Sequence, residues 1–284
     1  MARPPLPSFD LIVGTLGRTT ELEELLESLA AQTHREFRVL VVDQSDDDRV
    51  LELVRCHNGS SIDYLRSERG LSRARNLALE HVAADVVGFP DDDCRYPPTL
   101  LAEVAARFSD ARLDGLLGRT TDALGRTPTR SKDDRAVLTD DNLWNRGSSA
   151  TMFLRSALVE RVGAFDEHLG VGSGAPSSSA EEIDYLVRAV RSGARIEYDP
   201  TVVVQHELRV DDPAKGLRDG HSIGYLLRKH HYPARVVARM LVRPVGGALL
   251  SLARLDLATA RYYASTLRGR ASGYLGTSSS KSSA

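Results

Sequence analysis

The chain contains little cysteine and tryptophan and has no long apolar run. Its two cysteines, Cys56 and Cys94, have neither a disulfide framework nor a metal-ligand spacing, which excludes a disulfide-stapled scaffold. No apolar run reaches about 18 residues, so we expect no transmembrane helix. The N-terminal segment, Met1 to Ser8, is rich in proline and lacks the apolar stretch of a signal peptide. These absences predict a cytoplasmic protein, attached at most peripherally to the inner face of a membrane.

The composition is that of a folded globular chain. Hydrophobic residues make up 42% and charged residues 27% of its 284 residues, which is enough to bury a large core. The net charge of −2 is unevenly distributed, because ten Lys and Arg but only one acid follow from Gly220 onward. We expect this basic end to meet an anionic membrane surface or a phosphorylated acceptor, or to dock on the acidic body. We expect no nucleic-acid partner.

The first part of the chain alternates short apolar strands with helical patterns. The expected strands are 9–15, 36–43, 62–65 and 86–89, and the expected helices are 21–31, 50–54, 70–81 and one from 99. This alternation predicts an α/β fold with a parallel sheet covered on both faces. Ligands bind such sheets beyond the carboxyl ends of the strands, where Thr15, Asp43 and Asp91 to Asp93 fall.

Three consecutive carboxylates, Asp91 to Asp93, end the fourth apolar strand. Adjacent ionised acids repel one another and are costly to bury unless a cation is close. Because oxygen ligands suit Mg²⁺ or Mn²⁺, the triplet predicts a divalent-cation site, with a solvated acidic turn as the alternative. Cys94, directly after the acids, is interpreted as a spacer.

The second part of the chain is less regular. Its polar and its periodic stretches predict a loop over 120–141, a strand over 149–154, a helix over 156–162, a Gly- and Ser-rich lid or linker over 170–179, a helix over 180–192 and a strand over 201–206. The last helix begins with Glu181 and Glu182, and the last strand ends in His206. Both glutamates also fit a plain helix start capped by Ser179, and a lone histidine after a strand is often structural.

A basic helical region follows from 222 to 268. Arginines recur every four and then every seven residues, so each set lies on one helix face: Arg235, Arg239, Arg243, then Arg254, Arg261 and Arg268. Pro244 and the glycines after it are interpreted as the break between two helices. The pair is either an amphipathic surface binder or packs on the body. The Ser-rich end, 277–284, is expected to be disordered.

Seven short motifs occur in order over about 10–207. They are Leu11-Ile12-Val13-Gly14-Thr15 with Arg18, Asp43-Gln44-Ser45-Asp46-Asp47, Gly70-Leu71-Ser72-Arg73-Ala74-Arg75-Asn76, Asp91-Asp92-Asp93, Gly163-Ala164-Phe165-Asp166-Glu167, Glu181-Glu182-Ile183-Asp184 and Val204-Gln205-His206-Glu207. Together they resemble a family 2 glycosyltransferase of the GT-A fold. Ala164 stands where the family has a second Gly. Two departures bear on the acceptor: Glu182 stands where the family usually has Asp, and the loop from Asn145 to Ser149 matches no acceptor signature.

The resemblance implies a Rossmann-like nucleotide-binding sheet flanked by helices, with a C-terminal helical extension. Residues 1–115 would form the nucleotide-sugar-binding half, 116–210 the acceptor-binding half of the same GT-A domain, and 211–284 the basic extension. It further implies a metal-dependent, inverting glycosyltransferase that uses Mn²⁺ or Mg²⁺ and a nucleoside-diphosphate sugar, with a UDP-sugar favoured. The acceptor would be a hydroxyl of a glycan, a lipid-linked sugar or a small molecule.

The resemblance also implies a role for each site residue. Asp93 would hold the metal together with His206 and with Asp91 or Asp92. The nucleotide would be bound by Thr15, Arg18, Asp43, Gly70, Arg75, Asp91 and Asp92. Glu182, with Glu181 in reserve, would take the proton of the acceptor hydroxyl, because a direct displacement needs one general base. Trp144, Asn145 and Asp184 would contact the acceptor.

Two other functions compete with this interpretation. Gly220-His221-Ser222-Ile223-Gly224 fits the Gly-x-Ser-x-Gly elbow of serine hydrolases, but it lacks the buried strand that must precede it, and no His follows Asp256. A non-catalytic sugar-nucleotide-binding subunit would keep the donor site and show no turnover. The first glycine-rich turn has no lysine for a nucleotidyltransferase and does not match the dinucleotide fingerprint.

Overall fold

A computed structural model describes residues 6–57, 61–127, 132–207 and 212–276. Internal contacts divide the chain into two units. The first holds the residues up to 165 together with 185–208, and the second holds 166–184 together with the residues from 209 onward. The expected division at residues 115 and 210 stays a prediction. The expectation for the Ser-rich end lies outside the described residues.

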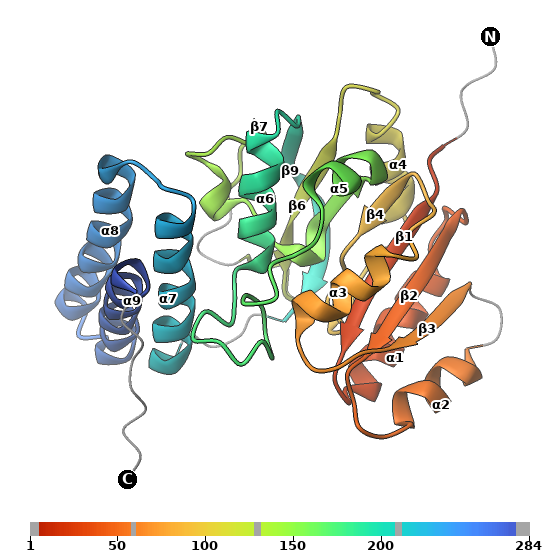
Figure 1. Cartoon of the computed structure of the whole chain (residues 1–284), viewed down its shortest axis with the longest axis horizontal. Coiled ribbons are helices and arrows are strands. Elements are labelled where there is room, and N and C mark those ends of the chain that lie inside the picture. Colours follow the sequence, from red (N-terminus) through yellow and green to blue (C-terminus); the bar gives the residue numbers. More distant parts are fainter. Residues whose placement is uncertain (1–5, 58–60, 128–131, 208–211, 277–284) are drawn as a thin grey trace. The chain divides into compact units, whose positions relative to one another are not determined.

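The first unit is built on a mixed β-sheet (Figure 1). Its described strands are β1 Phe9–Thr15, β2 Phe37–Asp43, β3 Ile62–Arg66, β4 Val86–Gly88, β5 Cys94–Arg95, β6 Gly115–Thr121, β7 Ala136–Val137, β8 Met152–Arg155 and β9 Ile196–His206. Their order is β3-β2-β1-β4-β8-β6-β9-β5, with β7 on β9. Strands β1 to β4 pair in parallel as expected, whereas β8 is antiparallel to both β4 and β6. The parallel sheet predicted for the first part of the chain is therefore confirmed over β1 to β4, and β8 makes the complete sheet a mixed one.

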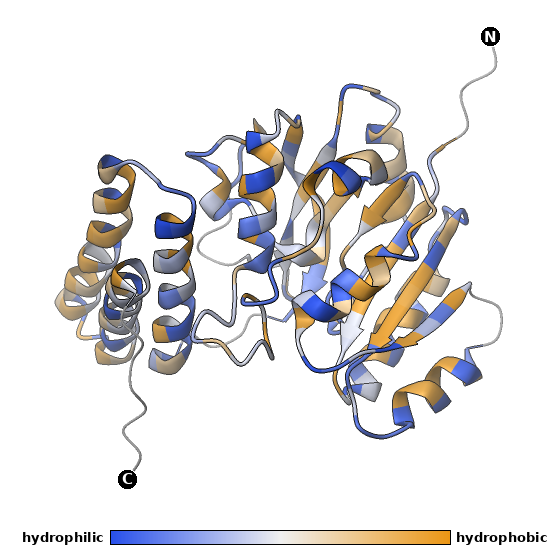
Figure 2. Ribbon diagram, in the orientation of Figure 1, coloured by the Kyte–Doolittle hydropathy of each residue, from blue (hydrophilic) through white to orange (hydrophobic). Residues whose placement is uncertain are grey.

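Helices cover both faces of this sheet, as predicted. They are α1 Thr19–Ala30, α2 Arg49–Cys56, α3 Leu71–Leu79, α4 Leu100–Arg107, α5 Ser156–Val162 and α6 Glu181–Arg191, the last of which begins in the second unit. Alternate residues of a strand point to opposite faces. On one face Leu11 and Val13 pack with the leucines of α1 in a buried cluster. On the other, Gly14 leaves the room that Leu71 and Ala74 of α3 occupy. Figure 2 shows the apolar strands β1 and β2 between these layers.

The strand β6 was not expected, and its sequence explains why. It contains two glycines and ends in Arg119-Thr120-Thr121, which resembles the start of a polar loop. Gly118 is required there because a Cβ at this position would lie 2.1 Å from the carbonyl oxygen of Val202. The polar loop expected over 120–141 in fact begins with the end of β6 and contains β7, which pairs with β9.

The second unit contains α7 Pro213–Lys229, α8 Ala234–Ala253 and α9 Leu257–Leu275. The sequence predicted two helices separated at Pro244, and this is wrong: Pro244 lies inside α8. A proline at this position cannot donate to the carbonyl four residues earlier. That carbonyl, of Met240, accepts a hydrogen bond from the Arg270 guanidinium of α9 instead. The helix continues through Pro244 because a side chain from its neighbour replaces the missing donor.

The Gly-x-Ser-x-Gly sequence lies in the middle of α7, where it serves helix packing. A Cβ at Gly224 would lie 2.1 Å from the carbonyl oxygen of Arg270, and one at Gly273 would lie 2.1 Å from that of His221. Ser222 is fully buried, and its hydroxyl donates to the Arg218 carbonyl. A helix interior is not a strand-to-helix elbow, so the serine-hydrolase alternative is wrong.

Helix α8 bears on the expectation that the chain has no transmembrane helix, which stays a prediction. It spans 20 residues and is, by length and composition alone, long and apolar enough to cross a membrane, with 28% of its apolar window buried. The search for an uninterrupted apolar run missed this helix, because Arg239 and Arg243 interrupt its apolar sequence.

Candidate active site

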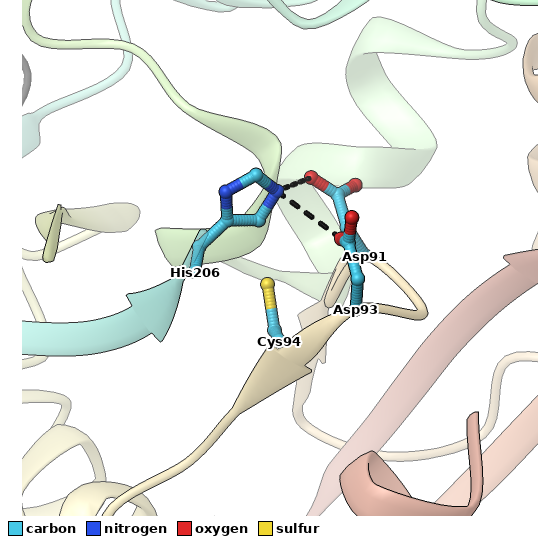
Figure 3. Close-up of side chains that lie close together, drawn as sticks. All are labelled: Asp91, Asp93, Cys94 and His206. Carbon is cyan, nitrogen blue, oxygen red and sulfur yellow. Dashed lines mark ion pairs between the residues drawn. The ribbon is translucent and has the colours of Figure 1, made fainter. Parts of the chain in front are cut away.

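Four side chains of the first unit form a cluster at the carboxyl end of β4 (Figure 3). One ligand atom from each of Asp91, Asp93, Cys94 and His206 lies within 4.8 Å of the others. The His206 Nε2 atom is 3.1 Å from Asp93 Oδ1 and 3.9 Å from Asp91 Oδ2. The strand pairing explains the meeting, because Cys94 of β5 lies directly opposite His206 of β9.

The middle acid of the triplet points elsewhere. Asp92 accepts hydrogen bonds from the Thr15 hydroxyl at 2.8 Å and from Arg18 at 2.7 Å, while a second Arg18 nitrogen is 3.0 Å from Asp93. Burial raises the pKa of Asp92 to about 6, although Thr15 and Arg18 act in the opposite direction. The structure thus brings Thr15 and Arg18 to the triplet, and it pairs Asp91 rather than Asp92 with His206.

The charge state of His206 follows from its two acidic neighbours. Burial alone would lower the pKa of His206, but the hydrogen bond with Asp93 and the charges of Asp91 and Asp93 outweigh it and raise that pKa. Cys94 is fully buried, and burial raises the pKa of its thiol well above the ordinary range. The two acids therefore favour the protonated ring of His206, a proton that a bound cation would displace, and the Cys94 thiol keeps its own proton.

This donor set fits a hard divalent cation. Mg²⁺ takes ligands at about 2.1 Å, so two ligands on opposite sides of one ion lie about 4.2 Å apart, near the spacing of the cluster. Carboxylate oxygens with one imidazole suit Mn²⁺ or Mg²⁺, whereas a thiol that keeps its proton is a poor ligand. Asp91, Asp93 and His206 are thus the residues that could hold the ion.

A second group of polar side chains surrounds Asp43 at the end of β2. Asp43 is fully buried and accepts hydrogen bonds from the Ser45 backbone N–H and from the Tyr64 hydroxyl, each at 2.8 Å. The Gln44 side chain accepts from the Gly70 backbone N–H at 2.8 Å. Gly70 has a φ of 134°, which favours glycine at the residue before α3. The turn after β2 and the start of α3 are thereby fixed together.

Arg75 connects this region to the acidic triplet. It is 1% exposed, its guanidinium lies 3.4 Å from Asp91, and it is 5.8 Å and 5.5 Å from the ring centroids of Phe89 and Phe165. Because the buried guanidinium contacts two aromatic rings and a carboxylate, these three contacts fix its position. Arg75 therefore orients Asp91.

The carboxylates at the start of α6 belong to the second unit. Glu181 is 5% exposed, and Glu182 is half-buried. Asp184 is fully buried, with the Lys229 ammonium 2.6 Å and the His230 ring nitrogen 2.8 Å from its Oδ1 atom. The same ammonium lies 2.6 Å from Asp166. Burial alone would lower the pKa of Lys229, but these two carboxylates raise it, so the lysine stays charged.

The residue before α6 has an unusual backbone. Ala180 has a φ of 66°, and its carbonyl accepts from the Asp184 N–H. Ala180 rather than Ser179 therefore begins the helix, and the Ser179 hydroxyl donates to Ser222 instead. A positive φ costs free energy for any residue with a Cβ, and such strain is often found at functional sites.

The predicted acceptor residues are divided between the units. Trp144 and Asn145 form a short 3₁₀ turn in the first unit, where the indole N–H donates to the Asp140 carbonyl at 3.0 Å. Both side chains are half-buried. Asp184 is buried in the ion pairs of the second unit. Their contact with an acceptor stays a prediction.

Four residues near these sites were missed in the sequence. Ser149 donates to Asp91 at 3.1 Å, and Tyr64, Gln44 and Lys229 fix Asp43, Gly70 and Asp184. Ser149, Tyr64 and Lys229 have no local signal, since each lies in a different element from its partner. Only the Gln44 position, next to Asp43 in the strand-end turn, could have been found from its motif.

Comparison with known proteins agrees with this geometry. Residues 10–165 match the family described as glycosyl transferase family 2. The pre-mycofactocin glycosyltransferase of Mycobacterium tuberculosis is 24% identical over 277 residues, which cover 88% of this chain and 53% of the relative. Glycosyltransferase AglE of Haloferax volcanii is 23% identical over 215 residues, covering 72% and 68%. The chain thus spans about half the length of the first of these relatives.

Solved structures of similar shape are also glycosyltransferases. S. aureus TarS 1–349 in complex with UDP-GlcNAc has a TM-score of 0.62 at 20% identity, over 95% of this chain and 92% of that one. The mannosyltransferase PcManGT from Pyrobaculum calidifontis, in complex with GDP-Man and Mn²⁺, has a TM-score of 0.67 at 15% identity, over 97% and 89%. The fold is the GT-A fold, and the chain belongs to glycosyl transferase family 2.

Proposed function

We propose that this glycosyltransferase moves a sugar from a nucleoside-diphosphate sugar to an acceptor hydroxyl, with inversion at the anomeric carbon and with a divalent cation. The observation that carries the proposal is the cluster of Asp91, Asp93 and His206, whose ligand atoms lie within 4.8 Å of one another. A partly buried group of acids and an imidazole at the carboxyl end of a strand is an arrangement that can bind a metal and a diphosphate in α/β sheets.

The donor is proposed to be a UDP-sugar. Asp43 stands at the end of β2, where a nucleoside would meet the sheet, and its fixed carboxylate can accept from a base or a ribose. TarS has been solved with UDP and with UDP-GlcNAc, and PcManGT with GDP-Man. These ligands support a nucleotide-sugar donor for this chain.

The chemistry requires charge stabilisation and one base. As the bond between the anomeric carbon and the diphosphate breaks, the electron pair leaves with the diphosphate. A bound Mn²⁺ or Mg²⁺ would supply positive charge for that oxygen. Glu182 takes the proton of the acceptor hydroxyl as its oxygen bonds to the anomeric carbon, and this single displacement inverts the configuration. Glu181, more deeply buried, is the reserve base.

The acceptor is proposed to be a glycan, a lipid-linked sugar or a small molecule. A role in the synthesis of surface polysaccharide, glycolipid or a secondary-metabolite glycoside would fit each of them. Trp144 and Asn145 are proposed to form its floor, because a half-buried indole offers a flat apolar face to a sugar ring. Asp184, which supports the start of α6 through Lys229 and His230, is proposed to position the acceptor.

The test uses two variants with different expected losses. Screening UDP-, GDP- and dTDP-sugars with Mn²⁺ identifies the donor, and transfer is then measured with and without the metal. Asp93→Ala should lose metal-assisted donor binding, whereas Glu182→Gln should bind donor normally and lose transfer. Normal transfer in either variant would refute the role of that residue. Tight donor binding by the wild type without turnover on any acceptor would favour the non-catalytic subunit.

A further inference from the structure

Exposed apolar side chains gather on α8 and α9. Among the described residues, eight of the thirteen large apolar side chains with high exposure lie on these helices or in the turn between them: Val242, Val245, Leu249, Leu250, Leu252, Leu255, Leu257 and Leu275. Their exposed fractions run from 39% to 87%. Exposed apolar side chains gathered in this number on two neighbouring helices mark a place of contact with another molecule or a membrane.

The two faces of α8 differ in what they contact. Its buried residues lie one, three, four and seven positions apart, which places them on one helix face: Val236, Val237, Met240, Pro244 and Ser251. Gly247 belongs to the same face, since a Cβ there would lie 2.8 Å from the Tyr263 ring of α9. The remaining face carries Val242, Leu249 and Leu252, and Figure 2 shows apolar residues along much of the helix. This outer face has no packing reason within the unit to be apolar.

Arginines flank that apolar face. Arg235, Arg239 and Arg243 are exposed and recur every four residues, so they line one side of the helix. Arg254 and Arg261 add exposed cations at the α8–α9 turn and on α9. The only acid between Ala234 and Leu275 is Asp256, whose side chain accepts from the Thr259 N–H as the cap of α9. The surface is thus apolar and cationic together.

The α8–α9 turn supplies an independent observation. Leu255 has a φ of 59°, a region that suits glycine, and its side chain is 87% exposed. The chain therefore accepts backbone strain at this turn and extends a leucine into solvent, between the exposed Leu252 and Leu257. Leu255 therefore stabilises neither the backbone of the turn nor the packing of the second unit.

We infer that the α8–α9 hairpin, residues 234–275, lies in the interface of a bilayer that contains anionic lipid. The leucines and valines enter the acyl boundary, and the arginines bind lipid phosphates, as in amphipathic interfacial helices. The anionic cytoplasmic leaflet is the surface that a basic segment of this kind selects. A spanning orientation of α8 is disfavoured, because it would place Arg239 and Arg243 within the hydrocarbon and one helix face packs on α9.

The experiment is flotation of the full chain with phosphatidylcholine vesicles, with and without phosphatidylglycerol. Wild type should float only with anionic vesicles and be released by high salt. Leu255→Gly should weaken binding about ten-fold, while its melting temperature stays equal or rises because the positive φ is relieved. The double variant Arg235→Glu, Arg243→Glu should weaken binding by at least about five-fold per arginine.

Matched controls lie on the first unit. Leu124→Ser removes a leucine that is 77% exposed, and Arg112→Glu reverses an arginine whose side chain is 77% exposed; neither should change flotation. The proposal is overturned if wild type does not float, or if Leu255→Gly floats as well as wild type. It is equally overturned if the leucines mediate a dimer that the same variants dissociate without vesicles, or if high salt and alkaline carbonate both fail to release the protein.

Discussion

Asp10 is a buried carboxylate of β1 that binds Arg38 of β2 and the backbone just before β4. It is 2% exposed and accepts two hydrogen bonds from the Arg38 guanidinium, each at 2.9 Å, and two from the Ala83 and Ala84 backbone. Burial would raise the pKa of Asp10, but Arg38 and the two backbone donors outweigh it and lower that pKa. The folded chain therefore favours the ionised form.

Asp10→Asn should destabilise the protein by about 2 kcal/mol near neutral pH, since hydrogen bonds to a charged group are lost. Because the folded pKa is the lower one, the stabilisation is complete above the unfolded pKa and is lost as pH falls through the folded pKa. Denaturant unfolding should show a constant gap between wild type and variant above about pH 5 that closes below about pH 4. Asp63→Asn, which removes the half-exposed second partner of Arg38, should cost less than about 1 kcal/mol. An equal cost for both variants would contradict this account.

Lys229 holds two carboxylates in the second unit, the fully buried Asp184 and the half-buried Asp166. Lys229→Met leaves Asp184 and Asp166 without their shared ammonium, and breaking such a buried pair costs about 3 kcal/mol. Thermal unfolding should show the loss, and transfer should fall with it because Asp184 lies two residues after Glu182 on α6. Arg218→Met on the same helix, at a side chain that is 49% exposed, should change stability by about 0.5 kcal/mol or less. A stable and fully active Lys229→Met would show that the network is dispensable.

Residue identities at strand ends could be predicted from the sequence, and their partners could not. Asp43, Asp93 and His206 follow apolar runs, and that position is visible in one dimension. The partner of each is set by topology: Cys94 meets His206 because β5 pairs with β9 across more than a hundred residues. Lys229 and Ser149 belong to no sequence motif, so only the folded chain shows that they contact Asp184 and Asp91.

At the scale of elements, the spacing of apolar residues predicted a helix or strand correctly where the element buries an apolar face of its own. The alternation from β1 to α4 was predicted because β1, β2 and β4 are apolar and because α1, α3 and α4 each bury one face. The prediction failed where a neighbour supplies what the sequence lacks. Gly118 permits β6 through a close approach to β9, and Arg270 of α9 satisfies the carbonyl that Pro244 leaves without a donor.

The close packing of α7 on α9 gives an element-scale prediction. Gly224→Ala should cost about 2 kcal/mol or more, because the added Cβ would lie 2.1 Å from the Arg270 carbonyl and the helices must separate. Gly246→Ala on α8, where a Cβ meets nothing within 4 Å, should instead stabilise by up to about 1 kcal/mol through helix propensity. Ser222→Ala should keep full transfer activity. The packing account fails if thermal unfolding ranks the two glycine variants the other way.

At the scale of the whole molecule, the proposed donor site exists only in the folded chain. Thr15, Asp43, Asp93 and His206 come from four strand ends spread over nearly two hundred residues. An unfolded chain cannot hold them together, so a ligand of this site should stabilise the native state by mass action. This coupling provides a test of metal and nucleotide binding that does not depend on knowing the acceptor.

UDP with Mn²⁺ at about a hundred times its dissociation constant should add about 2.7 kcal/mol, which raises the melting temperature by about 5–10 °C for a unit of this size. EDTA should abolish most of the shift, because Asp91, Asp93 and His206 then lack the cation that would link them to the diphosphate. Asp93→Ala should behave like wild type in EDTA, whereas Glu182→Gln should keep the full shift because the base does not bind the nucleotide. A full shift in EDTA would mean that the nucleotide binds through Arg18 and Arg75 alone, and the metal-dependent part of the proposal would then be wrong.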